Sequence, residues 1–132
     1  MAKLTDAERA FIRENQFCGV VTTLRKDGSP HSTVVWVDEK DGKVVFNTAY
    51  PRAKSRELER DPRATVVVMD RNDDYRWISV SGPVSLTTDG ANEVINRLSN
   101  KYDGTDFKGF RDSETRVTAL VTPEKVDSRG ID

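Results

Sequence analysis

A short basic segment, Pro51 to Arg63, carries the residues whose types and spacing point most directly to chemistry. Arg52, Lys54 and Arg56 fall in the first turns of an expected helix, and no acidic residue precedes Glu57 there. A helix N-terminus carries about half a positive charge, so each cation there costs a few tenths to about 1 kcal/mol unless an anion shares the site. Free backbone N–H groups at the same end suit phosphate or carboxylate. The segment therefore predicts an anion site.

Two interpretations of these cations stay open on the residues alone. At helical spacing Arg52 and Arg56 share one face and can surround a ligand phosphate, whereas Lys54 points elsewhere. The alternative is a solvated face, on which Lys54 pairs with Glu57 and Arg56 pairs with Glu59. Such pairs contribute only a few tenths of a kcal/mol each.

Composition excludes several other classes of function. The chain has 132 residues, and its 21 basic side chains nearly balance 22 acidic ones, so no overall charge favours nucleic acid or an anionic membrane surface. One histidine and one cysteine cannot build a histidine-rich or cysteine-based metal site, and no metal is expected. A single cysteine and a charged N-terminal segment predict a cytoplasmic protein without a signal peptide or membrane span.

The elements that must position the basic segment are mostly strands. Hydrophobic periodicity and turn residues predict helices over residues 5–14, 51–60 and 88–102, and strands over 17–24, 30–37, 43–47, 64–69, 75–86 and 116–121. Residues 38–42 are expected to form a turn, residues 103–112 a loop and residues 122–132 a polar tail. Neighbouring antiparallel strands with short helices between them predict a mainly β protein, a six-stranded antiparallel barrel, in one domain over residues 1–132.

Several motifs together resemble one known superfamily. They are Asn47 to Leu58 (NTAYPRAKSREL), Asp61 to Ala64 (DPRA), Gly19 to Leu24, Asp27 to His31, and Arg76 to Gly82. In this order, across roughly residues 14 to 122, they are similar to the pyridoxamine 5'-phosphate oxidase-like split-barrel superfamily. The resemblance implies a split β-barrel of the FMN-binding type.

The Pro-Arg-Ala-Lys form of residues 51–54 resembles the deazaflavin-dependent branch of that superfamily. This resemblance implies coenzyme F420 as cofactor, with its phosphate bound by Arg52, Lys54 and Arg56. The residues implied to line the same pocket are Asn47, Thr48, Ala49 and Ala53. The second strand, with Ser32, Val34 and Trp36, is implied to lie along the tricyclic ring.

The resemblance also implies a homodimer with two sites at the subunit interface. Tyr75 and Trp77 are then expected to reach the cofactor bound mainly by the other subunit. The implied activity is transfer of a hydride from reduced F420 to an unsaturated or conjugated small molecule, such as a biliverdin-like tetrapyrrole or a quinone.

Two departures from the vitamin oxidases of the superfamily bear on cofactor and reaction. Those enzymes carry an Arg and a Lys on the second strand that help to hold FMN, and residues 32–37 offer neither. They also hold their substrate with a C-terminal Arg-x-His, and no histidine follows His31. Pyridoxamine phosphate oxidation is therefore disfavoured. The alternatives are an FMN-binding flavin reductase or oxidase, and a non-catalytic dimer that carries cofactor or tetrapyrrole.

The catalytic residues are not identified by any motif. His31 and Tyr75 are candidate proton donors, since a near-neutral histidine or a phenol can serve in acid–base steps. The more common role of a histidine at the start of a strand is a simple hydrogen bond. Cys18, in an apolar stretch without a neighbouring cation, is expected to be a small buried residue.

Overall fold

The computed structural model of the chain describes residues 2–132 and confirms a mainly β, antiparallel architecture. In chain order the elements are α1 (Asp6–Arg13), β1 (Gly19–Leu24), β2 (Pro30–Val35), β3 (Asp38–Lys40), β4 (Lys43–Tyr50), α2 (Ala53–Arg60), β5 (Arg63–Asp70), β6 (Asp73–Thr87), α3 (Ala91–Asp103), β7 (Thr115–Val121) and β8 (Lys125–Arg129). None of the helices in the described part of the chain is long and apolar enough to cross a membrane.

The prediction of six strands was wrong, because the sheet has eight. β3 lies where a turn was expected, and β8 lies in the segment expected to be a polar tail. Both are short and rich in charged residues, with the sequences DEK and KVDSR. Their own residues have little strand propensity, and they are strands because they pair with β4 and β6.

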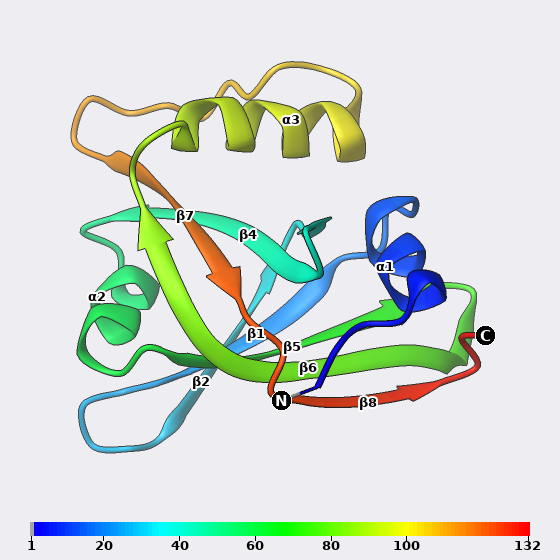
Figure 1. Cartoon of the computed structure of the whole chain (residues 1–132). Coiled ribbons are helices and arrows are strands. Elements are labelled where there is room, and N and C mark those ends of the chain that lie inside the picture. The colour runs from blue at the N-terminus through cyan, green and yellow to red at the C-terminus, as the bar shows by residue number, and fades with distance from the viewer. Residues whose placement is uncertain (1) are drawn as a thin grey trace.

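One long strand joins the two halves of the sheet. Along the sheet the strands run in the order β2, β1, β5, β6, β7, β4 and β3, with β8 pairing with β6 off this path. β6 pairs with β5 over most of its length, and its last residues, Val84 to Thr87, pair instead with β7. Figure 1 shows β6 curving from the lower half of the molecule to the upper half, where β4 and β7 lie under α3.

The core lies between these two halves. Val21 of β1, Val66 of β5 and Ile78 of β6 meet Phe46 of β4, and each of these side chains is fully buried. Burial alternates along β1 and β5, as expected for strands with one face on the core. Each such side chain contributes about 1.5–3 kcal/mol relative to an exposed position.

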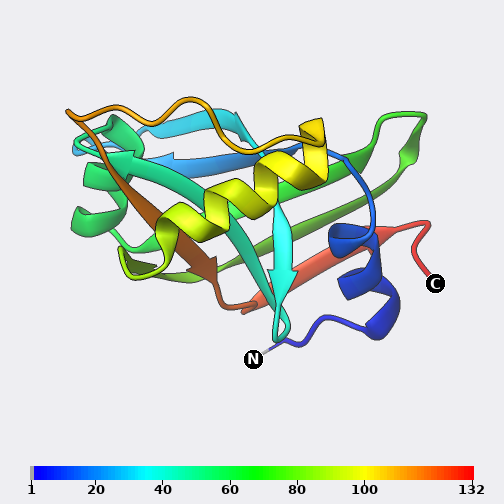
Figure 2. The same ribbon diagram turned by 90° about the horizontal axis from the view of Figure 1, so that it is seen from above.

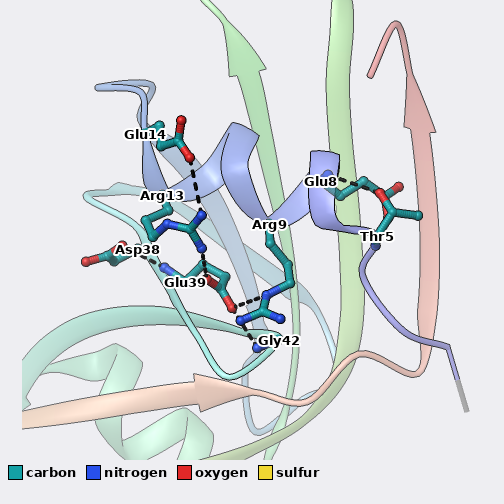
Figure 3. A network of polar contacts seen from close by, with 8 residues as sticks. All are labelled: Thr5, Glu8, Arg9, Arg13, Glu14, Asp38, Glu39 and Gly42. Atoms are coloured by element: carbon teal, nitrogen blue, oxygen red, sulfur yellow. Dashed lines mark hydrogen bonds and ion pairs between the residues drawn. The ribbon is translucent and has the colours of Figure 1, made fainter. Parts of the chain in front are cut away.

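A buried ion-pair cluster fastens α1 to the β3–β4 hairpin (Figure 3). Glu39 of β3 accepts hydrogen bonds from Arg9 Nε at 2.8 Å, Arg13 at 2.7 Å and the backbone N–H of Gly42 at 2.6 Å. Burial alone raises the pKa of the Glu39 carboxyl, but these donors outweigh it and hold that pKa below its usual value. Figure 2 shows α3 crossing over β4 and β7. Ile95 is one of the residues of α3 that are buried.

Candidate functional site

A cationic cavity of about 360 Å³ lies at the start of α2. Residues of β2, β4, α2, α3 and β7 line it. Trp36, which follows β2, and residues 107–111 of the loop after α3 also contribute to the wall. The lining residues are Cys18, Val34, Val35, Trp36, Asn47, Thr48, Arg52, Lys54, Ile95, Leu98, Phe107, Gly109, Arg111 and Arg116. Four of them are basic and none is acidic, so the cavity is suited to an anion.

The start of α2 has the electrostatics that the sequence predicted, but begins two residues later than expected. The helix begins at Ala53, and its N-cap Arg52 makes no side-chain capping bond. No acidic residue lies in the first turn. Buried Ser55 donates to the carbonyls of Arg52 and Ala49, at 2.8 and 3.0 Å, which ties this turn to the end of β4.

Lys54 faces the cavity, so the prediction that it points elsewhere was wrong. Burial lowers the pKa of its ammonium group, and the nearby cations Arg52 and Arg116 lower it further. No ion pair among residues 2–132 involves Lys54. The pairs expected for a solvated face do not form, because Glu57 instead accepts from Thr23 and contacts His31.

Arg116 of β7 supplies a second cation without a carboxylate partner among the described residues. It is 7% exposed, and its Nε donates to Asn47 Oδ1 at 2.9 Å. Asn47 Nδ2 in turn donates to the carbonyl of Ala91, which fixes the amide. The guanidinium lies 5.0 Å from the centre of the Phe107 ring. Burial and the neighbouring Arg52 lower the pKa of Arg116, and nearby Glu114 offsets only part of this effect.

Arg52 differs from these two cations, because Glu114 binds it. Its Nε and one terminal nitrogen donate to the two carboxylate oxygens of Glu114, at 2.7 and 3.0 Å. This pairing raises the pKa of Arg52 and lowers that of Glu114. Lys54 is thus a half-buried cation and Arg116 a buried one, and neither forms an ion pair within residues 2–132. Glu57 near Lys54 and Glu114 near Arg116 offset part of their charge from a longer distance.

The predicted cofactor-binding residues divide into two groups. Val34, Trp36, Asn47, Thr48, Arg52 and Lys54 line the cavity. Ser32, Ala49, Ala53, Arg56 and Trp77 do not. Ala49 is buried under α2, Ser32 bonds Thr22 on the outer sheet face, and the Arg56 Nε donates to the Pro51 carbonyl.

Neither candidate proton donor lines the cavity. His31 belongs to β2, opposite Thr23 of β1, and its Nδ1 is 2.9 Å from Glu57 Oε1. Tyr75 is 66% exposed near the far end of β6, and its ring lies 5.2 Å from the guanidinium of Arg129. Among residues 2–132 no group of histidine, cysteine, aspartate and glutamate side chains is arranged to hold a metal ion.

Apart from Val35 on the second strand, sequence reasoning missed seven lining residues, namely Cys18, Ile95, Leu98, Phe107, Gly109, Arg111 and Arg116. The prediction of a buried Cys18 was wrong, since this thiol is exposed just before β1. Arg116 was expected on a strand, but only the β4–β7 register, which sets it opposite Ala49, brings it to the start of α2. A single sequence carries no signal for that register.

Comparisons with known proteins agree with this geometry. The family model described as Pyridoxamine 5'-phosphate oxidase matches residues 4–130. A solved structure described as an F420 reductase is 25% identical, with a TM-score of 0.79 over 89% of this chain and 94% of that one. A conserved hypothetical protein from Mycobacterium tuberculosis is 22% identical, with a TM-score of 0.76 over 98% of this chain and 88% of that one.

More distant structures share the fold. The heme storage protein HutZ from Vibrio cholerae is 12% identical, with a TM-score of 0.69 over 98% of this chain and 97% of that one. The matches confirm the superfamily resemblance and the split-barrel fold predicted from the sequence motifs.

Proposed function

The chain belongs to the pyridoxamine 5'-phosphate oxidase family, and on that premise we propose that it is an oxidoreductase whose cationic cavity binds the phosphate of coenzyme F420. The observation that carries the proposal is that two cations of the cavity wall, Lys54 and Arg116, form no ion pair, while no carboxylate lines the cavity. Burial without an ion-pair partner is unfavourable for both groups, and a bound phosphate lowers that cost. Arg52 adds a bidentate donor if phosphate replaces Glu114 as its partner.

The walls beside the cations fit the ring of the same cofactor. Val34 is 69% exposed at the end of β2, and Trp36 follows it along the cavity wall. β2 carries no arginine or lysine of the kind that the FMN-dependent oxidases use, which favours F420 over FMN. The relative described as an F420 reductase supports the same choice.

When bound in its reduced form, F420 supplies a hydride to an unsaturated or conjugated acceptor. The residues of this chain bind the phosphate, orient the ring along β2 and keep water from one of its faces. Since neither His31 nor Tyr75 lines the cavity of this protomer, we propose that the proton that completes the reduction comes from solvent or from a second subunit.

We also propose that the working unit is a homodimer built on the outer face of β2, β1 and β5. Val34, Val20 and Val67 form a row across these strands, set opposite one another by the register, and are 69%, 41% and 37% exposed. An exposed apolar row on a sheet suits contact with another protein surface. Val34 also borders the cavity, so a partner packed on the row reaches the cavity mouth. Trp77 and Tyr75 of that partner are the residues proposed to meet the cofactor.

The proposal is tested by titrating the purified protein with F420 and with FMN side by side, followed by quenching of tryptophan fluorescence. We expect F420 to bind at least about tenfold more tightly, which corresponds to roughly 1.4 kcal/mol. Tighter binding of FMN would replace the proposal with a flavin reductase or oxidase. Binding of F420 without turnover of its reduced form on tetrapyrroles or quinones would indicate a cofactor carrier.

A further inference from the structure

Trp36 lines the cavity, and a residue of α3 holds its side chain in place. Trp36 lies on Tyr102, with ring centres 5.5 Å apart and ring planes only 14° from parallel. Tyr102 belongs to the last turn of α3. Ile95 and Leu98 of the same helix line the cavity, whereas Tyr102 does not. One face of the Trp36 indole is therefore backed by an aromatic ring from outside the site.

Hydrogen bonds fix Tyr102 to the residue that follows Trp36 and to the segment before β1. Its hydroxyl donates to the carbonyl of Phe17 at 2.7 Å and accepts from the backbone N–H of Val37 at 3.0 Å. Burial raises the pKa of this phenol to about 12, so it stays protonated and keeps donating at any physiological pH. Lys101, the preceding residue, donates to the carbonyl of Val37 at 2.7 Å and to that of Ile12 at 2.8 Å.

These contacts act on the point where the chain leaves β2. Residues 36 and 37 connect β2 to β3 and belong to neither strand, so the sheet ladders do not fix the direction of the Trp36 side chain. The stack on Tyr102 and the hydrogen bonds from the end of α3 fix that direction instead. An aromatic wall held in one orientation loses little freedom when a flat ligand packs on it.

We infer that Tyr102 is a positioning residue, which fixes Trp36 as a flat platform for the tricyclic ring of the cofactor while Lys54 and Arg116 hold the phosphate. The inference rests on the proposed function for its ligand and extends it to the ring end of the site. Under this inference, α3 and Trp36 contribute to the binding of the cofactor ring, whereas α2 and β7 contribute to the binding of its phosphate.

The test is a double-mutant cycle on the full chain between Tyr102→Leu and Trp36→Ala. Dissociation constants for F420 and FMN are measured by the fluorescence anisotropy of the ligand, so loss of a tryptophan does not affect the signal. Stacking of a base on an aromatic side chain is worth about 1–3 kcal/mol by alanine substitution. We therefore expect Tyr102→Leu to weaken binding about tenfold when Trp36 is present and less than about twofold when it is absent.

Two further variants separate positioning from general stability. Tyr102→Phe keeps the stacked ring and loses only the hydroxyl, so we expect it to bind within about threefold of the wild type. Lys54→Ala shares no contact with Tyr102, so its effect is expected to add to that of Tyr102→Leu.

Equal losses from Tyr102→Leu with and without Trp36 would overturn the inference, as would Tyr102→Phe losing as much affinity as Tyr102→Leu. Tyr102→Phe keeps this test open if Tyr102→Leu does not fold. If the wild type binds F420 but the effects of Tyr102→Leu and Trp36→Ala simply add, the inference about Tyr102 is wrong and the proposed function stands. If the two effects are coupled for FMN only, the choice of F420 is wrong and the role of Trp36 as a platform stands. If the wild type binds neither ligand, both the inference and the proposed function are wrong.

Discussion

At the residue scale, the cations of the cavity come from two separate parts of the chain, the start of α2 and residues 111–116, which lead into β7. A cation-rich helix start without an acidic residue indicated an anion, and the structure adds a cavity lined by Arg52 and Lys54. Of the three residues expected to bind a phosphate, Arg52 and Lys54 line the cavity and Arg56 does not. Arg116 completes the set from a strand far away in sequence.

The lowered pKa of Lys54 makes F420 affinity dependent on pH. The ammonium form binds phosphate, and burial together with Arg52 and Arg116 lowers its pKa below the usual 10.5 in the free protein. Affinity should thus fall as the pH rises through that lowered value, because binding must then take up a proton. The measurement is the F420 dissociation constant from about pH 8 to pH 10.

Lys54→Arg is the matched variant for this profile, since a guanidinium does not titrate in that range. Cys18 also lines the cavity, and the variant retains it, so its contribution is the same in both profiles. We expect the variant to show the shallower decline. Identical profiles for both proteins would mean that Lys54 does not contact the phosphate.

At the element scale, the sequence predicted those segments that bury an apolar face. α1, α3 and the long strands have clear hydrophobic periodicity, and each lies within a few residues of its expected range. β3 and β8 could not be predicted, because pairing with β4 and β6 makes them strands while their own side chains are mostly charged. The cavity could not be predicted for the same reason, because the sheet register and the path of residues 104–114 bring its walls together.

The cluster around Glu39 predicts a defined loss of stability in acid. Glu39 has a lowered pKa in the folded protein, so the stability that it contributes is present above its ordinary pKa of 4.5 and is lost as the pH falls through the folded value. Glu39→Gln removes the charge that Arg9 and Arg13 bind. We expect it to cost about 1.5–3 kcal/mol at neutral pH and to flatten the acid dependence, as measured by urea unfolding.

Glu14→Gln is the control for this prediction, because Glu14 also pairs with Arg13 but is 64% exposed. An exposed pair contributes about 0–1 kcal/mol, so this variant should leave the acid dependence unchanged. Equal effects of the two substitutions would show that the Glu39 cluster does not anchor α1.

At the scale of the whole molecule, the proposed homodimer places the valine row of β2, β1 and β5 against a second copy. Val67→Lys puts a charge at the β5 end of this row, where burial without a partner is costly. We expect it to yield a folded monomer in analytical ultracentrifugation. Asn92→Lys introduces the same charge on exposed α3 and should leave the dimer intact. A dimer that persists in Val67→Lys would place the interface elsewhere.

The claim on which this account depends is that the cations at the start of α2 bind the cofactor phosphate. Its most direct test compares F420 titrations of the wild type, of Arg52→Ala with Lys54→Ala, and of Arg60→Ala with Lys40→Ala. The last variant removes two exposed cations outside the cavity. We predict at least about a 100-fold loss of affinity for the first double variant, from two charged contacts of about 1.5–3 kcal/mol each, and wild-type affinity for the second. Unchanged F420 affinity in the folded Arg52→Ala and Lys54→Ala protein would contradict the claim.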